Sequence, residues 1–114
     1  MRVGIDLLEI SRMEEALERR PGLEQRVFTE GERAYAARKA RPAQHLAARF
    51  CVKEAVAKAL RLEAWNHQDI EVVGEAAQIG VALHGALADL EVDVEISLTH
   101  SRDTAGAVAV VVAR

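Results

Sequence analysis

The residues best suited to chemistry lie in one stretch without Gly or Pro, residues 43–62. Glu54 and Lys58 are four apart, so on a helix they share one face. Arg49 and Lys53, also four apart, would lie next to that face on the helix surface. A carboxylate flanked by cations suits a magnesium–phosphate site, because the carboxylate binds the metal and the cations neutralise phosphate oxygens. The alternative is a solvated Glu54–Lys58 ion pair, which contributes about 0.3–0.5 kcal/mol to helix stability.

A second carboxylate follows the first apolar segment of the chain. Asp6 stands after Gly4 and Ile5, toward the end of a predicted strand over residues 2–8. An Asp in this position can face a crevice, and magnesium usually takes one or two carboxylates together with substrate phosphates. Asp6 and Glu54 would form such a pair. The alternative is an Asp that caps a turn.

A third polar group ends a predicted strand near the C-terminus. In a regular strand, Ser97 and Thr99 point to one face, and Leu98 and His100 point to the other. Hydroxyl groups and an imidazole at a strand end can bind phosphate. The alternative is a polar strand end that is simply exposed to solvent.

Helices that would position these residues are predicted in the first half of the chain. The S-x-x-E pattern at Ser11 and the T-x-x-E pattern at Thr29 are capping boxes, which mark helix starts. Pro21 and Pro42 follow the first two helical segments. The predicted helices extend over residues 11–20, 30–39 and 43–62, and the last of them is the longest and richest in helix-forming residues.

In the second half of the chain, polar and apolar residues follow the two-residue period of β-strands. Residues 92–100 alternate polar and apolar side chains, and residues 105–113 are almost unbroken apolar; a short turn between them predicts a hairpin. Two shorter strands are predicted at residues 69–73 and 79–83. The expected fold class is α+β: an N-terminal strand, about three helices with one long central helix, and a C-terminal antiparallel sheet, in a single domain over residues 1–114.

Composition excludes several classes of protein. The single Cys51 excludes a disulfide framework and paired CxxC zinc sites, and it is predicted to be a small core residue, because no His is placed to activate it. Aromatic residues make up only 4%, which disfavours a base-stacking nucleic-acid platform. The absence of a long apolar run or a signal-like N-terminus makes the cytoplasm the expected location.

Charge is unevenly distributed along the chain. Residues 1–62 carry 13 Lys and Arg against 9 Asp and Glu, a net of +4. Residues 63–114 carry 2 against 9, a net of −7. This asymmetry is consistent with an acidic partner for the first half, although a helical half and a sheet half often differ in charge without one.

Three motifs together resemble one family. They are Gly4-Ile5-Asp6, the block RFCVKEAVAK over residues 49–58, and SLTH over residues 97–100. In this order, and in a chain this short, they are similar to the holo-[acyl-carrier-protein] synthase type of 4′-phosphopantetheinyl transferase. The resemblance spans nearly the whole chain.

The resemblance implies a magnesium-dependent transfer of 4′-phosphopantetheine from coenzyme A to a serine of an apo-acyl carrier protein, in fatty acid biosynthesis, with release of adenosine 3′,5′-bisphosphate. It implies that Asp6 and Glu54 bind Mg²⁺ and that Glu54 and Lys58 are catalytic. The residues that it assigns to coenzyme A are Arg49, Lys53, Lys58, Thr99 and His100. The general base stays unassigned: Glu54 or a metal-bound water are the alternatives.

The resemblance also implies a docking surface for an acidic carrier protein on an Arg-rich first helix. Arg12, Arg19 and Arg26 recur every seven residues and would line one face if the helix continued past Pro21; Leu23 would add an apolar contact. One departure from the family is the loop over residues 74–80, which lacks the usual Gly-Lys-Pro.

The last predicted strand is apolar on both faces, and residues 105–113 need cover on each. A second subunit is the simplest source of that cover; the resemblance sharpens this to a homotrimer with active sites between subunits. The alternative is a central strand covered by the chain's own helices. Rival functions are another magnesium-dependent phosphoryl-transfer enzyme and a non-catalytic module that binds acidic proteins.

Overall fold

The computed structural model describes all residues, Met1–Arg114, as an α+β protein. The strands are β1 (Arg2–Glu9), β2 (Ile70–Val73), β3 (Gly80–Leu83), β4 (Val92–His100) and β5 (Thr104–Ala113). The α-helices are α1 (Ile10–Arg19), α2 (Leu23–Val27), α3 (Glu30–Ala37) and α4 (Pro42–Leu60). Short 3₁₀ turns occupy His67–Asp69, Ala76–Gln78 and Gly85–Leu87. The predicted α+β plan is therefore observed, with one additional short helix, α2.

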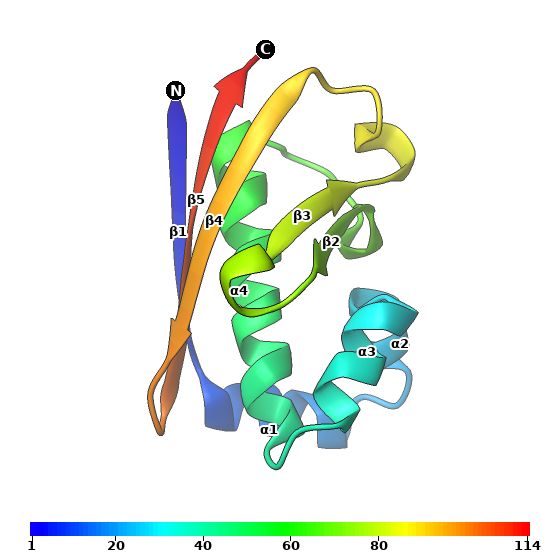
Figure 1. Ribbon diagram of the computed structural model, residues 1–114. Coiled ribbons are helices and arrows are strands. Elements are labelled where there is room, and N and C mark those ends of the chain that lie inside the picture. Colours follow the sequence, from blue (N-terminus) through cyan, green and yellow to red (C-terminus); the bar gives the residue numbers. More distant parts are fainter.

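Two antiparallel sheets form. The larger has the order β1–β5–β4, so the N-terminal strand pairs with the last strand, and β4 and β5 make the predicted hairpin. The smaller is the β2–β3 hairpin. Helix α4 packs along one face of the larger sheet, and the other helices lie on the same side (Figure 1).

The core lies between α4 and the inner face of the larger sheet. Small residues of α4 such as Ala55 and Ala59 are buried, as are Ala107 and Ala109 of β5, so helix and sheet approach closely. Helix α4 is buried along most of its length, which explains why its residues are apolar almost all round. None of the helices is long and apolar enough to span a bilayer.

Both predicted helix starts lie within one residue of the observed ones, but only one of the two predicted capping boxes forms. Thr29 caps α3: its hydroxyl accepts from Glu32 N at 3.2 Å, and the Glu32 carboxylate accepts from Thr29 N at 2.8 Å. At α1 no capping box forms at Ser11, because the helix begins at Ile10. Ile10 is fully buried and its N–H donates to Asp103 O at 2.8 Å, so a tertiary contact sets the start.

The condition for a continuous arginine face, a helix that continues past Pro21, is not met. Helix α1 ends at Arg19, and Gly22 adopts φ +86°, a left-handed conformation that reverses the chain before α2 begins. Arg12 and Arg19 therefore belong to one helix and Arg26 to another. The seven-residue spacing does not place the three on one straight surface.

The outer face of the larger sheet has no cover within the chain. On β1, Val3, Ile5 and Leu7 are 58%, 62% and 69% exposed. Their cross-strand partners on β5 are Val110, Val108 and Gly106, so the apolar surface continues across two strands. The prediction that the last strand needs cover on its second face thus extends to the first strand.

Candidate active site

Gly4 determines how closely β1 approaches α4. A Cβ atom at this position would lie 2.9 Å from Ala59 N and would overlap the carbonyl of Ala55, both backbone groups of α4. Only glycine fits here without moving the helix. This contact is the physical reason for the glycine in the Gly4-Ile5-Asp6 motif.

The close approach brings Asp6 to the charged face of α4. Asp6 pairs across the sheet with Ala107, which is buried, so both side chains face the helix. The Lys58 ammonium lies 3.1 Å from Asp6 Oδ1 and donates to Ile5 O at 2.9 Å. The structure therefore joins the two motifs as the sequence predicted, although Lys58 pairs with Asp6 and not with Glu54.

Glu54 lies one turn earlier on α4 and contacts a residue that the sequence analysis did not select. His67 Nε2 lies 2.8 Å from Glu54 Oε2, and each side chain is about 30% exposed. Since a carboxylate can only accept, His67 donates. The other oxygen of Glu54 accepts no hydrogen bond from the chain.

The thiol of Cys51 lies inside the protein, 3.7 Å from Ala105 O of β5. Its pKa is raised to about 12, first by burial and then by the negative charges of Asp6 and Glu54, with Lys58 opposing. Asp6 and Glu54 therefore both raise the pKa of the same buried thiol on α4. Cys51 itself is fully buried and protonated, which agrees with its prediction as a core residue.

This arrangement fits a magnesium ion. No group of three or more His, Cys, Asp or Glu side chains is present that could hold a metal through protein ligands alone. Asp6 and Glu54 are two carboxylates, and Mg²⁺ is commonly bound by one or two carboxylates, with substrate phosphates and water as its remaining ligands. The donor set therefore suits a metal that arrives with a phosphate substrate.

Lys53 has a different role from the one predicted. Its ammonium is 0% exposed, lies 2.8 Å from Glu32 Oε1, and donates to His67 O at 2.8 Å and Ile70 O at 2.6 Å. All three N–H groups are used inside the protein. The prediction that Lys53 contacts coenzyme A is therefore wrong; it ties α4 to α3 and to the segment before β2.

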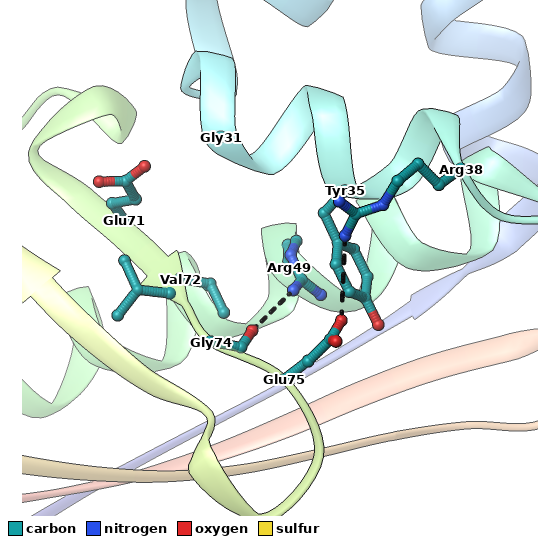
Figure 2. Close-up of a pocket in the computed structure, with 9 residues that line it drawn as sticks. Gly31, Tyr35, Arg38, Arg49, Glu71, Val72, Gly74 and Glu75 are labelled. Atoms are coloured by element: carbon teal, nitrogen blue, oxygen red, sulfur yellow. Dashed lines mark hydrogen bonds and ion pairs between the residues drawn. The ribbon is translucent and has the colours of Figure 1, made fainter.

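Arg49 lines a cavity of about 390 Å³ beside β2 (Figure 2). Its guanidinium stacks on Tyr35 at 3.8 Å from the ring centroid, and Nη2 donates to Gly74 O at 3.4 Å. Arg49 is only 3% exposed, its Nε has no partner, and burial lowers its pKa. At the mouth, Arg38 faces Glu75 at 4.0 Å.

A neighbouring cavity of about 410 Å³ shares Tyr35 and Arg49 and adds His100. The rings of Tyr35, His45 and His100 follow one another edge to face, with centroids 5.7 Å and 5.4 Å apart. Burial, then His100 and nearby cations, lowers the pKa of His45. His45 was not selected from the sequence, since an isolated His in a helix carries no local signal.

Thr99 does not share this cavity. It pairs with Gly106 on the outer face of the sheet, whereas His100 pairs with Ala105 on the inner face. The alternation predicted for this strand is thus observed, and it separates the two residues. Ser97, which lies on the same face of β4 as Thr99, does line the cavity with His100.

A third cavity, of about 380 Å³, lies between α1, α2 and α4. Its walls are mostly apolar, with Arg12 and Arg20 among them. Leu23, which was predicted to contact the carrier protein, is among the lining residues. Arg19 and Arg26 do not line this cavity. Arg20 does, although the seven-residue spacing did not select it; it is the C-cap residue of α1.

Comparisons with known proteins agree with this geometry. The family model of the 4′-phosphopantetheinyl transferase superfamily matches residues 2–110. The chain belongs to this superfamily. The holo-[acyl-carrier-protein] synthase of Moorella thermoacetica is 42% identical over 97% of this chain and 93% of its own length, and that of Chlamydia trachomatis serovar D is 41% identical over 95% and 96%.

Solved structures of the superfamily share the fold. The Chronobacterium ammoniagenes ACPS–CoA complex superposes with a TM-score of 0.88 at 27% identity, covering 99% of this chain and 97% of that one. The Mycobacterium tuberculosis acyl carrier protein synthase gives a TM-score of 0.78 at 40% identity, with the same coverage. The resemblance drawn from three motifs and the α+β fold class are both confirmed.

Proposed function

We propose that this chain acts as a holo-[acyl-carrier-protein] synthase through the site between β1 and α4. The enzyme transfers 4′-phosphopantetheine from coenzyme A to a serine of apo-acyl carrier protein and releases adenosine 3′,5′-bisphosphate. Relatives of this name at 35–42% identity and solved coenzyme A complexes support this activity. The observation that carries the site assignment is the Asp6–Lys58 ion pair between β1 and α4, with Glu54 one turn before Lys58 on the same helix.

Asp6 and Glu54 hold Mg²⁺ in this proposal. When bound, the ion neutralises the pyrophosphate of coenzyme A and orients it for in-line attack on phosphorus. Lys58, more than half exposed, lies beside Asp6 and neutralises phosphate oxygens. Positioning and charge neutralisation supply most of the catalysis in such a reaction, so no strong base is needed.

The two cavities that share Tyr35 and Arg49 receive the nucleotide part of coenzyme A. Glu71 and Glu75 also line the first, and Glu95 also lines the second. Arg49 and His100 line one continuous region with Tyr35 between them, and these groups suit an anionic, aromatic ligand. In this proposal, Tyr35 and the loop at Gly74 and Glu75 make the nucleotide contacts that the Gly-Lys-Pro sequence would make in other members of the family. Thr99 contributes only if the site extends over the outer face of the sheet, as a site shared between subunits does.

The apolar cavity between α1 and α2 receives the carrier protein. Arg12 and Arg20 flank it and Leu23 lies within it, which suits an acidic helix with an apolar side chain at its centre. Arg19 and Arg26 then lie at the margin and steer the approach of the carrier. Phe50 and His67 also line this cavity, so a docked carrier lies beside Glu54.

The functional unit is a homotrimer. The uncovered apolar side chains on β1 and β5 need a partner, since contiguous exposed apolar surface of this kind usually marks an interface. Burying Val3, Ile5 and Leu7 against a neighbouring subunit brings that subunit close to Thr99. Each active site then lies between two subunits.

The two rival functions explain less of the geometry. A different magnesium-dependent enzyme, such as a small nuclease, usually gathers further acids at the metal, and none joins Asp6 and Glu54. A non-catalytic module for acidic proteins would use only the cavity at Arg12 and Arg20, and would leave the carboxylate pair without a purpose.

One experiment separates these functions. Purified protein, coenzyme A, MgCl₂ and an apo-acyl carrier protein are incubated, and the carrier is weighed by mass spectrometry. The expected result is a gain of one phosphopantetheine group on the carrier. Binding of the carrier without any gain in mass would favour the non-catalytic module. If the carrier gains no mass and the protein cleaves a nucleic acid in a parallel incubation with MgCl₂, the nuclease is favoured.

A further inference from the structure

The side chain of His67 is held on both faces. Its ring stacks on Phe50 with centroids 5.4 Å apart and planes 13° apart, and packs on Trp65 at 4.2 Å and 42°. Two aromatic neighbours leave the imidazole little freedom to rotate. Its Nε2 points along the remaining direction to Glu54 Oε2, at 2.8 Å.

The backbone of His67 is fixed as well. Its carbonyl accepts from Lys53 Nζ at 2.8 Å, and that ammonium is anchored by the buried carboxylate of Glu32. The 3₁₀ turn that starts at His67 is capped by Asn66, whose side chain accepts from Gln68 N at 2.9 Å. The backbone and the side chain of His67 are therefore both held by contacts within the protein, and these contacts do not require a bound metal or coenzyme A.

We propose that His67 is a positioning residue for Glu54, an inference that rests on the proposed magnesium site. By donating to Oε2, the imidazole fixes the carboxylate in one rotamer and leaves the other oxygen for the metal. Mg²⁺ requires near-ideal octahedral geometry, so a carboxylate held in place binds it with a smaller loss of side-chain entropy. Lys53 then acts indirectly, through the backbone of His67.

The structure argues against a purely structural reading of this contact. A structural His needs no charged partner, since Phe50 and Trp65 already pack against the ring. Glu54 and His67 are each about 30% exposed, so their hydrogen bond adds little to stability. What it changes is the direction of a carboxylate that lies near Asp6.

The test uses two variants of the full-length protein that differ in one property. His67→Phe keeps an aromatic ring between Phe50 and Trp65 but removes the donor. His67→Gln loses the stacking but keeps an N–H close to the position of Nε2. Binding of Mn²⁺, as a magnetic probe for Mg²⁺, is measured by electron paramagnetic resonance with coenzyme A present, alongside the melting temperature and the Mg²⁺ concentration for half-maximal transfer.

We expect His67→Phe to weaken Mn²⁺ binding about 10–100-fold, the usual effect of losing a hydrogen bond to a metal ligand. Its melting temperature should stay near that of the parent, and the Mg²⁺ concentration for half-maximal transfer should rise. His67→Gln should recover most of the affinity. Equal Mn²⁺ affinity in His67→Phe and the parent would overturn the positioning role, and so would equal losses in both variants.

Two further controls keep the conclusions separate. If His67→Phe does not fold, His67→Ala is compared with His67→Gln in the same way. If the parent transfers phosphopantetheine but binds no Mn²⁺, or binds it equally after Glu54→Ala, the metal site is wrong and His67 loses its role with it. If the parent binds Mn²⁺ but transfers nothing, the proposed function fails while the role of His67 is still decided by the variants.

Discussion

The ammonium of Lys53 and the carboxylate of Glu32 lie 2.8 Å apart in the interior, where neither reaches solvent. Glu32 Oε2 also accepts from Val72 N at 2.8 Å, so the pair joins α3, α4 and β2. Such a pair is stable only while both partners are present, because either charge alone is buried without compensation.

Lys53→Met is therefore expected to lower the free energy of unfolding by about 3–5 kcal/mol, measured by urea denaturation. Combining it with Glu32→Leu should restore part of the loss. Asp93→Asn removes an exposed pair with Arg114 at 3.0 Å and serves as the control, with an effect of at most about 1 kcal/mol. An unchanged urea midpoint in Lys53→Met would contradict the structural role assigned here.

The carboxylate pair is tested by Asp6→Asn and Glu54→Gln, which keep the shape of each side chain. Each should reduce the transfer rate by at least about 10²-fold, the size of one lost electrostatic element. Chelation of Mg²⁺ should abolish transfer in the parent. Circular dichroism verifies that the variants are folded, and near-normal rates in either folded variant would exclude that residue as a ligand.

Gly4 should tolerate no side chain. Gly4→Ala forces β1 away from the backbone of α4, so we expect a loss of about 1–3 kcal/mol in stability and a lower transfer rate, because Asp6 moves with the strand. Thermal unfolding and the transfer assay measure both. Gly80→Ala is the matched control, since a Cβ there contacts nothing within 4 Å; similar losses in both variants would count against the close approach.

We expect carrier docking to depend on Arg12 and Arg20. Reversing either to Glu should raise the KM for the carrier protein, more strongly at low salt, with little change in the KM for coenzyme A. Arg61→Glu, beyond the far end of α4, should leave both constants unchanged. Steady-state kinetics at two ionic strengths measure both constants. If Arg20→Glu has the same KM for the carrier as the parent, this cavity is not part of the docking surface.

The outer face of the sheet is tested by Ile5→Glu. Ile5 is exposed within one chain, so a charge there should leave the subunit folded but break its assembly, and activity should be lost with it. Val110→Glu on the neighbouring strand should act alike. Light scattering gives the mass of each variant. Leu90→Glu, an exposed apolar residue away from this face, is the control; a parent with a monomer's mass and full activity would refute the shared site.

Much of the fold follows from local sequence signals. The alternation over residues 92–100 gave the bounds of β4, and the absence of Gly and Pro over residues 43–62 gave α4 to within two residues. The capping box at Thr29 gave the start of α3. Periodicity and capping act over a few residues, so they can be interpreted without knowledge of the rest of the chain.

The roles of individual charged residues were decided only by tertiary structure. Lys53 and Lys58 lie in the same motif, yet one is buried on Glu32 and the other is exposed beside Asp6. Arg20, the C-cap residue of α1, lines a cavity, and its neighbour Arg19 does not. His67 meets Glu54 across 13 positions of sequence. Such contacts depend on how helices and strands pack, and no spacing within one segment encodes them.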